Sequence, residues 1–282
     1  MVAMENKKRS TPAKTSPTQA PTKQEDSGAL ARGLKLLGVM NEASRPLNLI
    51  DISELTGLAP STCHRILQTL LATGHVYRSD ATRYAVGVSA LSPLALAHPL
   101  NMIRRDAASI LQALQAEHGA SALLIAFLGV QRMVVDYVPG RGSVAPYFDT
   151  QIEAPYHASV SGKLLLSGLD EAARDALLGD APLTSRTQHT HVNRAALRKE
   201  LAHIVESGWA ANRNENLLGV SAVGVRLLAP SGRAVGALVL SGVDEHFANG
   251  RLDMMVEHLS RAADVLTRTS MSVRAMARFL NV

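Results

Sequence analysis

The sequence predicts an α+β protein with a small N-terminal part of three helices and a hairpin, and a larger C-terminal part built on a mixed, largely antiparallel sheet. Three observations support this prediction. Apolar residues recur at helical spacing in three short segments between residues 30 and 73. Two strand-like runs follow, separated by a polar turn. From residue 122 onward, apolar strand-like runs alternate with helical patterns.

The bulk composition allows two cores and gives a basic balance of charge. The chain has 282 residues, of which 46% are hydrophobic, and a formal net charge of +5. The first 92 residues carry 11 Lys and Arg against 7 Asp and Glu, whereas the remaining 190 carry 18 against 17. The excess of positive charge therefore lies in the N-terminal third, where it weakly favours a polyanionic partner.

Several classes of protein do not fit the sequence. No run of 18 apolar residues could span a membrane, and the N-terminus lacks the apolar stretch of a secretory signal. The single cysteine, Cys63, excludes an internal disulfide framework and fits a reducing compartment, so we expect a cytoplasmic protein. His189 and His191 have no cysteines or paired carboxylates nearby, and no nucleotide fingerprint is complete. We therefore expect no metal and no cofactor.

The N-terminal segments are predicted in order. Residues 1–28 are rich in Pro, Thr, Lys and Gln, which predicts a disordered polar tail. Residues 29–90 form the first predicted domain, whose opening helix carries leucines at helical spacing. Asn48 can cap the second helix, with Asp51 completing a carboxylate variant of the capping box, and Gly57 ends that helix.

The third helix is predicted from Pro60 to Thr73, because proline suits a first helical turn and Gly74 follows the last turn. Its buried face has the spacing i, i+3, i+4, i+7 and consists of Cys63, Ile66, Leu67 and Leu70. Residues 75–78 and 83–86 then form a hairpin, so the segment predicts a winged helix-turn-helix.

Hydrogen-bonding side chains occupy the predicted outer face of the third helix, and none of them is acidic. Long polar side chains on such a face can contact base edges in the major groove, and arginines on the hairpin can contact phosphate. The alternative is a solvated helix face, which the order of three helices and a basic hairpin makes less favoured. The predicted DNA-binding residues are Ser61, Thr62, His64, Arg65 and Gln68 on the helix, with Arg78 and Arg83 on the hairpin.

The rest of the chain predicts a helical linker over residues 91–104, a second domain over 105–270 and a C-terminal tail over 271–282. Strands are predicted over 122–128, 133–138, 221–228 and 234–241, and helices near 103–114, 158–167, 170–178, 193–207 and 252–266. Helices on a sheet of this kind form an α+β domain.

The sequence resembles the IclR family of transcriptional regulators from about residue 30 to residue 266. Residues 31–37 (ARGLKLL) and 55–67 (LTGLAPSTCHRIL) resemble the opening helix and helix-turn-helix of that family. Residues 157–163 (HASVSGK), 208–220 and 231–242 resemble three successive segments of its second domain. Several matches in the right order are more specific than a helix-turn-helix alone.

The resemblance implies a homodimer or tetramer with a GAF-like effector domain that binds a double-stranded DNA operator. Members respond to small organic acids, often aromatic ones, and control catabolic operons as repressors or activators. The effector expected here is thus a small-molecule carboxylate. The alternative is a hydrolase or other enzyme built on the second domain, but the sequence offers no assembled nucleophile, base and orienting group.

The resemblance also implies a set of effector-binding positions. Relatives that sense very small acids tend to have more polar and more negative residues at positions 212, 222 and 239, so we expect a larger or more apolar acid here. Arg226 is unusual for the family, and we hypothesise that it faces the pocket and pairs with an anion, the alternative being that it points into solvent. The implied positions are Ser143, Pro146, Ala154, Val160, Ser161, Asn212, Val220, Ala222, Val239 and Ser241.

Overall fold

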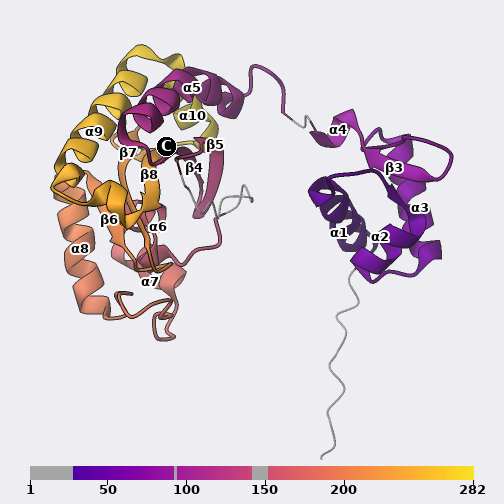
Figure 1. Cartoon of the computed structure of the whole chain (residues 1–282), viewed down its shortest axis with the longest axis horizontal. Coiled ribbons are helices and arrows are strands. Elements are labelled where there is room, and N and C mark those ends of the chain that lie inside the picture. The colour runs from indigo at the N-terminus through magenta and orange to yellow at the C-terminus, as the bar shows by residue number, and fades with distance from the viewer. Residues whose placement is uncertain (1–27, 92–93, 142–151) are drawn as a thin grey trace, which may run out of the picture. The chain divides into compact units, whose positions relative to one another are not determined.

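The computed structural model describes residues 28–91, 94–141 and 152–282 (Figure 1). The chain divides after residue 93 into two compact units. The predicted tail over residues 1–28 lies outside the described residues except for Gly28. None of the helices in the described ranges is long and apolar enough to cross a membrane.

The N-terminal unit contains the predicted three helices and hairpin. A short strand that the sequence did not predict adds to the hairpin, giving a three-stranded antiparallel sheet in the order β1-β3-β2. The elements are α1 Ala29–Glu42, β1 Leu47–Asn48, α2 Leu49–Thr56, α3 Pro60–Ala72, β2 Val76–Arg78, β3 Arg83–Val86 and α4 Val88–Leu91.

Local signals set the bounds of these helices. The side chain of Asn48 accepts a bond from the backbone N–H of Asp51 at 2.9 Å, and the Asp51 carboxylate accepts one from the N–H of Asn48 at 3.2 Å. Gly57 ends α2 at φ 68°, in the left-handed region where a side chain would be strained. Leu36, Ile52 and other apolar side chains of the three helices then share one core with the sheet.

The C-terminal unit is built on one five-stranded sheet in the order β5-β4-β8-β7-β6. The predicted antiparallel character is confirmed, and every pairing among the described strands is antiparallel. β6 was not predicted, since it is short and ends in polar residues. The strands are β4 Ser121–Leu128, β5 Gln131–Val138, β6 Trp209–Arg213, β7 Val220–Leu228 and β8 Ala234–Val243.

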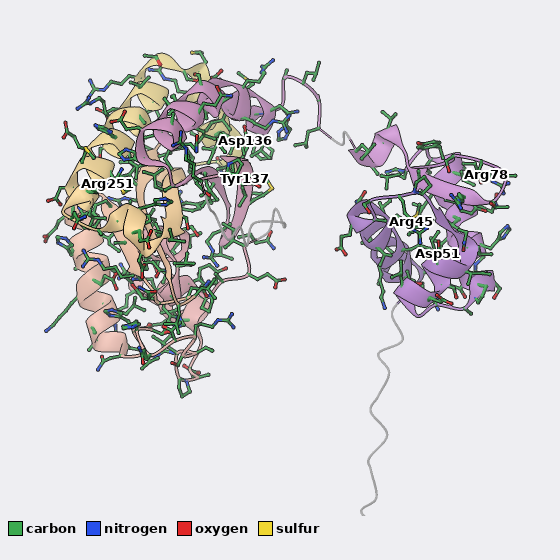
Figure 2. The ribbon with its side chains drawn as sticks, viewed as in Figure 1. Arg45, Asp51, Arg78, Asp136, Tyr137 and Arg251 are labelled. Atoms are coloured by element: carbon green, nitrogen blue, oxygen red, sulfur yellow. The ribbon has the colours of Figure 1, made fainter. Side chains whose placement is uncertain are left out.

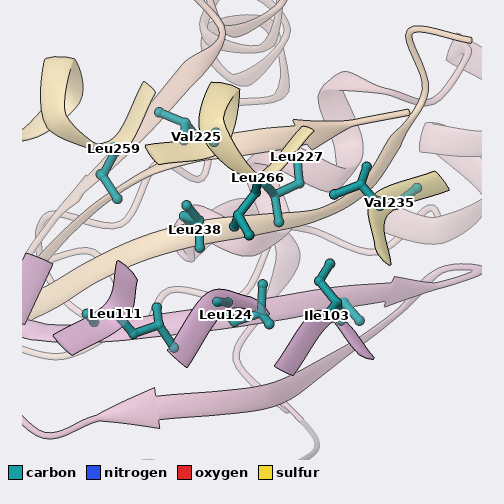
Figure 3. Close-up of a cluster of buried hydrophobic side chains, with 14 of the residues drawn as sticks. Ile103, Leu111, Leu124, Val225, Leu227, Val235, Leu238, Leu259 and Leu266 are labelled. Carbon is teal, nitrogen blue, oxygen red and sulfur yellow. The ribbon is translucent and has the colours of Figure 1, made fainter. Parts of the chain in front are cut away.

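Helices cover both faces of this sheet. On one face, α5 Pro99–His118, α9 Arg251–Thr269 and α10 Met271–Leu280 pack on β4, β7 and β8 around a large apolar core (Figure 3). On the other face, a second core joins the sheet to α6 Val160–Ser167 and α8 Arg194–Ser207. The remaining elements are α7 Glu171–Leu178 and the 3₁₀ turns η1 Tyr156–Ala158 and η2 Asp244–Phe247.

Two segments differ from the predictions. Residues 271–280 were predicted to be a tail, but they form α10, which buries Val273 and Met276 completely against the rest of the unit. Among the described residues of the predicted linker over 91–104, Leu91 and those from Pro99 onward are helical, whereas residues 94–98 do not form a helix. His98 then caps α5 by accepting a bond from the backbone N–H of Leu100 at 3.2 Å.

Candidate nucleic-acid interface and effector site

The helix α3 has one buried and one exposed face. Cys63 and Leu67 are fully buried, as the spacing of apolar residues predicts. The outer face is formed by the predicted polar residues, of which Thr62 is half-buried and the others exposed: Ser61, Thr62, His64, Arg65 and Gln68. The sequence of α3 contains no acidic residue, and no side chain caps its N-terminus. This end is therefore open to a phosphate group.

One side-chain contact and one groove lie at this face. The Nε2 atoms of Gln68 and His64 lie 3.3 Å apart, one turn from each other on the helix. Thr62 and Arg65 also line a groove of about 590 Å³ between α1 and α3. The guanidinium group of Arg65 remains exposed at the edge of this groove.

The hairpin holds Arg78 (Figure 2) in an exposed position. Arg83 is exposed as well. The Arg78 guanidinium lies 5.4 Å from the centre of the Tyr84 ring. Oδ1 of Asp80 closes the turn by accepting bonds from the backbone N–H groups of Thr82 and Arg83, both at 2.8 Å. The bond from Thr82 is the main reason why the pKa of Asp80 is below its usual range. The carboxylate of this basic hairpin is thus engaged by the turn itself.

The implied effector positions lie around the start of α6. Ser159 precedes this helix without capping it, so the first amides, at Val160 and Ser161, have no side-chain acceptor. Both residues are buried. A buried, uncapped helix start favours an anion through its free N–H groups and the helix dipole.

Three other implied residues lie side by side on the sheet beneath α6. Asn212, Ala222 and Ser241 are register partners on β6, β7 and β8. The Asn212 amide donates to the Ala158 carbonyl at 2.8 Å and accepts from the backbone N–H of Glu215 at 2.8 Å. Asn212 therefore connects the sheet to the residues that lead into α6.

The apolar positions are brought together only in part. Val160 and Val239 meet over Gly224, where an added Cβ would lie 2.8 Å from a methyl group of each. Val220 stands at the start of β7, opposite Val243, and is only half-buried. Two implied positions, Ser143 and Pro146, lie outside the described residues, whereas the carbonyl of Ala154 accepts a bond from Arg132.

Arg226 is the residue hypothesised to pair with an anion. It lies on the same face of β7 as Ala222 and Gly224, as strand alternation predicts. Its guanidinium, however, donates to the carbonyls of Ile204 at 3.5 Å and Val205 at 3.2 Å, at the C-terminal end of α8. Burial lowers the pKa of this group. Arg226 thus contacts the negative end of a helix dipole in this structure, and its pairing with an anionic ligand stays a prediction.

The sequence analysis missed Arg132, the second residue of β5. This arginine is 3% exposed, and its Nη1 donates to the hydroxyls of Ser159 at 2.6 Å and Ser161 at 3.3 Å. Its Nη2 donates to the carbonyls of Ile152 and Ala154, and its guanidinium carbon lies 4.2 Å from the centre of the Tyr156 ring. Alternation with the buried Val134 was the signal that could have placed this side chain on the inner face.

Lys163, unlike Arg132, is a buried cation that is paired with carboxylates. Its Nζ lies 2.7 Å from carboxylate oxygens of both Glu200 and Glu215, and it donates to the Ala211 carbonyl at 3.1 Å. The lysine thereby joins α6 to α8 and β6. Next to this cluster is a cavity of about 400 Å³, which His189 and His191 help to line. In the described ranges, no group of three His, Cys, Asp or Glu side chains could hold a metal ion.

A winged three-helix unit with an exposed polar helix, followed by a sheet domain, is the architecture of a DNA-binding transcriptional regulator. Comparison with known proteins gives the family. Residues 29–80 match the IclR helix-turn-helix domain, and residues 97–268 match the C-terminal domain of the bacterial IclR transcriptional regulators. The chain therefore belongs to the IclR family. Because this is a family of transcriptional regulators, the alternative of an enzyme is set aside.

Individual relatives agree with this assignment. The chain is 30% identical to the HTH-type transcriptional regulator XynR of Escherichia coli over 241 residues, which cover 85% of this chain and 96% of XynR. It shares its fold with the IclR of Thermotoga maritima (TM-score 0.70, 22% identity, 90% and 98% coverage). It also shares it with an IclR homologue of Microbacterium hydrocarbonoxydans in complex with 4-hydroxybenzoate (TM-score 0.74, 21% identity, 88% and 100% coverage).

Proposed function

We propose that this regulator binds a double-stranded DNA operator through α3 and the hairpin, and senses a small organic acid at the start of α6. The acid is of aromatic or comparable size, and the regulated genes form a catabolic operon. The protein acts as a homodimer or tetramer in the bacterial cytoplasm. Binding of the acid shifts DNA occupancy, because its affinity differs between arrangements that can and cannot bind the operator.

The observation that carries the DNA-binding part is the two-faced character of α3. Its inner side chains pack in the core of the N-terminal unit and hold the helix in place. The polar side chains of its outer face are not part of that core. Arg65 and Gln68 have the length and donor geometry to contact guanine and adenine. Ser61 and Thr62, at the uncapped end, suit phosphate, as do the exposed Arg78 and Arg83 of the hairpin.

The sensing part is supported by the chemistry around α6. The helix start supplies unpaired amides, while Ala222, Val160 and Val239 supply apolar surface. Asn212 and Ser241 lie in the same row of the sheet and add polar groups. An aromatic acid has the matching combination of a carboxylate and an apolar ring, and 4-hydroxybenzoate is the compound bound to the Microbacterium relative.

A paired assay tests the proposal. Duplexes selected from a random pool by the purified chain define its binding sequence, and their affinity is then measured with and without a panel of aromatic and aliphatic carboxylates. We expect at least one carboxylate to stabilise the protein against heat, to change DNA affinity and to be recovered unaltered. Failure to enrich any sequence would contradict the DNA-binding part. Conversion of the carboxylate into a product would contradict the sensor.

A further inference from the structure

Arg132 is a buried cation with no counter-ion among the described residues. Its four hydrogen bonds to other described residues all go to neutral oxygens, namely two serine hydroxyls and two backbone carbonyls. No carboxylate of the described residues lies within 4.0 Å of its guanidinium, in contrast to Lys163, which has two. Its Nε is also buried and has no acceptor. Burial lowers the pKa of Arg132 to about 10, which leaves the group charged at neutral pH.

The position of this charge makes its isolation more costly. Ser159 and Ser161, which accept from Arg132, flank the first residue of α6, whose helix dipole places partial positive charge at the same point. Two positive groups thus face one buried spot, and none of the described residues places a carboxylate between them. Burying a charge is unfavourable unless a partner of opposite sign compensates it. The arrangement is that of a site completed by an anion.

Unused donors converge there as well. The Ser161 hydroxyl accepts from Arg132 and donates to no described group, and the Nε–H of Arg132 is free. The backbone amides at the start of α6 add further donors without a side-chain acceptor. A carboxylate has only acceptor oxygens, and charge-assisted bonds to it are about twice as strong as neutral ones. A neutral amide of the same shape has one acceptor oxygen and two N–H donors. Those N–H groups would face the donors of the protein.

We propose that Arg132 is the charge partner of the effector carboxylate, so that this site admits an anionic ligand and rejects its neutral isostere. The inference rests on the proposed sensing function, which names the start of α6 as the effector site. It adds Arg132, which is not among the effector positions that the family resemblance implies. It also requires the ligand to be negatively charged. Under the competing explanation, Arg132 only fastens residues 152–161 to the sheet and has no preference for charge.

The test measures binding of matched pairs to the full-length protein by calorimetry. The probes are benzoate and 4-hydroxybenzoate, aliphatic carboxylates of similar volume, and the primary amide of each acid. For the wild type, we expect the acid of the best pair to bind at least about tenfold more tightly than its amide. Arg132→Gln retains hydrogen-bond donors but removes the charge, and should reduce acid binding about tenfold or more while leaving the amide unchanged.

A matched control and a conservative variant accompany the test. Arg226→Gln removes another half-buried guanidinium that donates only to backbone carbonyls, so it should leave acid binding at the wild-type level. Arg132→Lys keeps the charge without the planar fork, and should bind the acid better than Arg132→Gln does. Near-UV circular dichroism establishes that each variant retains its tertiary packing.

Each outcome has a defined meaning. Equal binding of acid and amide by the wild type would overturn the inference, even if Arg132→Gln does not fold. Unchanged acid binding by a folded Arg132→Gln would also overturn it while leaving the sensing function intact. Binding of no probe by the wild type would contradict the proposed sensing function itself, and the inference would fall with it.

Discussion

Buried ionisable side chains of the C-terminal unit differ in how their charge is compensated. The charge of Lys163 is compensated by two glutamates, and the half-buried Arg226 donates to the carbonyl end of α8. Arg132 contacts no charged group of the described residues. The first two arrangements serve packing, because every contact stays within the fold. An uncompensated charge is instead typical of a place where a ligand supplies the missing partner.

A histidine pair makes the stability of the same unit depend on pH. His118 is buried, and its Nε2 lies 3.1 Å from Nδ1 of His258. Burial, with a smaller effect from His258, lowers the pKa of His118. The unfolded chain therefore binds this proton more readily than the folded one, and stability is lost as the pH falls through the ordinary histidine value of about 6.5.

We expect the free energy of unfolding of the C-terminal unit to decrease as the pH falls from about 7.5 to about 5.5, the range in which an ordinary histidine takes up its proton. His118→Gln should make this free energy depend less on pH. The single tryptophan, Trp209, lies in this unit and reports its unfolding in urea by fluorescence. His191→Gln, which removes an exposed histidine, is the control. A His118→Gln profile as steep as that of the wild type would contradict the assignment.

The sequence predicts the burial of single residues well where helical or strand periodicity determines it. It predicts poorly which groups the end of a long side chain contacts. Helical spacing correctly divided α3 into a buried face and an exposed one around Cys63 and Leu67. Strand alternation gave the right face for Arg226 but not the helix end that its guanidinium reaches. Alternation with Val134 could have placed Arg132 on the inner face, but the partners of its guanidinium lie in a distant segment, residues 152–161, which alternation does not identify.

At the scale of elements, close approach of η1 to α6 fixes the candidate effector site. A Cβ built on Gly162 would overlap the backbone of Tyr156 and lie 2.7 Å from Oγ of Ser159. The glycine therefore allows the turn to fold directly over the helix start. This contact positions Ser159 and the free amides at the same time.

Gly162→Ala should destabilise the C-terminal unit by about 1–3 kcal/mol, since backbone atoms of Tyr156 cannot move aside as a flexible side chain could. It should also weaken carboxylate binding. Gly168→Ala, at the other end of α6, is the matched control, because its Cβ would meet only the Leu165 carbonyl at an ordinary 3.5 Å. Tryptophan fluorescence in urea measures both variants. Equal stability of the two would show that η1 does not constrain the helix start.

The C-terminal helix α10 makes a second prediction at this scale. Met276 is fully buried in the large core, whereas Met271, at the start of the same helix, is 61% exposed. Met276→Ala should therefore cost about 2–5 kcal/mol through the cavity it leaves, and Met271→Ala should cost little. Differential scanning calorimetry distinguishes them. Similar small losses in both variants would mean that α10 is a loosely attached tail, as the sequence first predicted.

Two of the elements that the sequence missed, β6 and α10, depend on single structural features. The strand β6 is short, and its edge position leaves Arg213 exposed, so it shows little apolar alternation. The helix α10 does carry apolar residues at helical spacing, but only one residue, Ser270, separates it from the end of α9 at Thr269. Its separate start depends on Ser270, which accepts a bond from the backbone N–H of Ser272 at 3.0 Å. Pairing with β7 therefore determines β6, and the cap at Ser270 determines where α10 begins.

At the scale of the whole molecule, two independently packed units carry the two proposed activities. The N-terminal unit holds a core of its own beneath α3, and the C-terminal unit holds two cores on either side of its sheet. The family, the helix-turn-helix and the antiparallel sheet were all predicted from sequence motifs in the correct order. The effector and the operator depend on contacts outside the chain and require binding experiments.

The central claim is that the outer face of α3 recognises DNA sequence, and a double variant tests it directly. Arg65→Ala combined with Gln68→Ala removes two proposed base contacts, each worth about 1–3 kcal/mol of discrimination, and leaves the buried face intact. Arg45→Ala is the control, because it removes one positive charge from the same unit at a side chain paired with Asp51 at 3.0 Å (Figure 2).

The decisive measurement compares affinity for a duplex selected by the wild-type protein with affinity for a scrambled duplex, at one fixed salt concentration. The account predicts that the double variant loses most of this discrimination, about thirtyfold to ten thousandfold, while its weak affinity for the scrambled duplex changes little. Arg45→Ala should retain the discrimination. A folded double variant that still distinguishes the two duplexes as the wild type does would contradict the account.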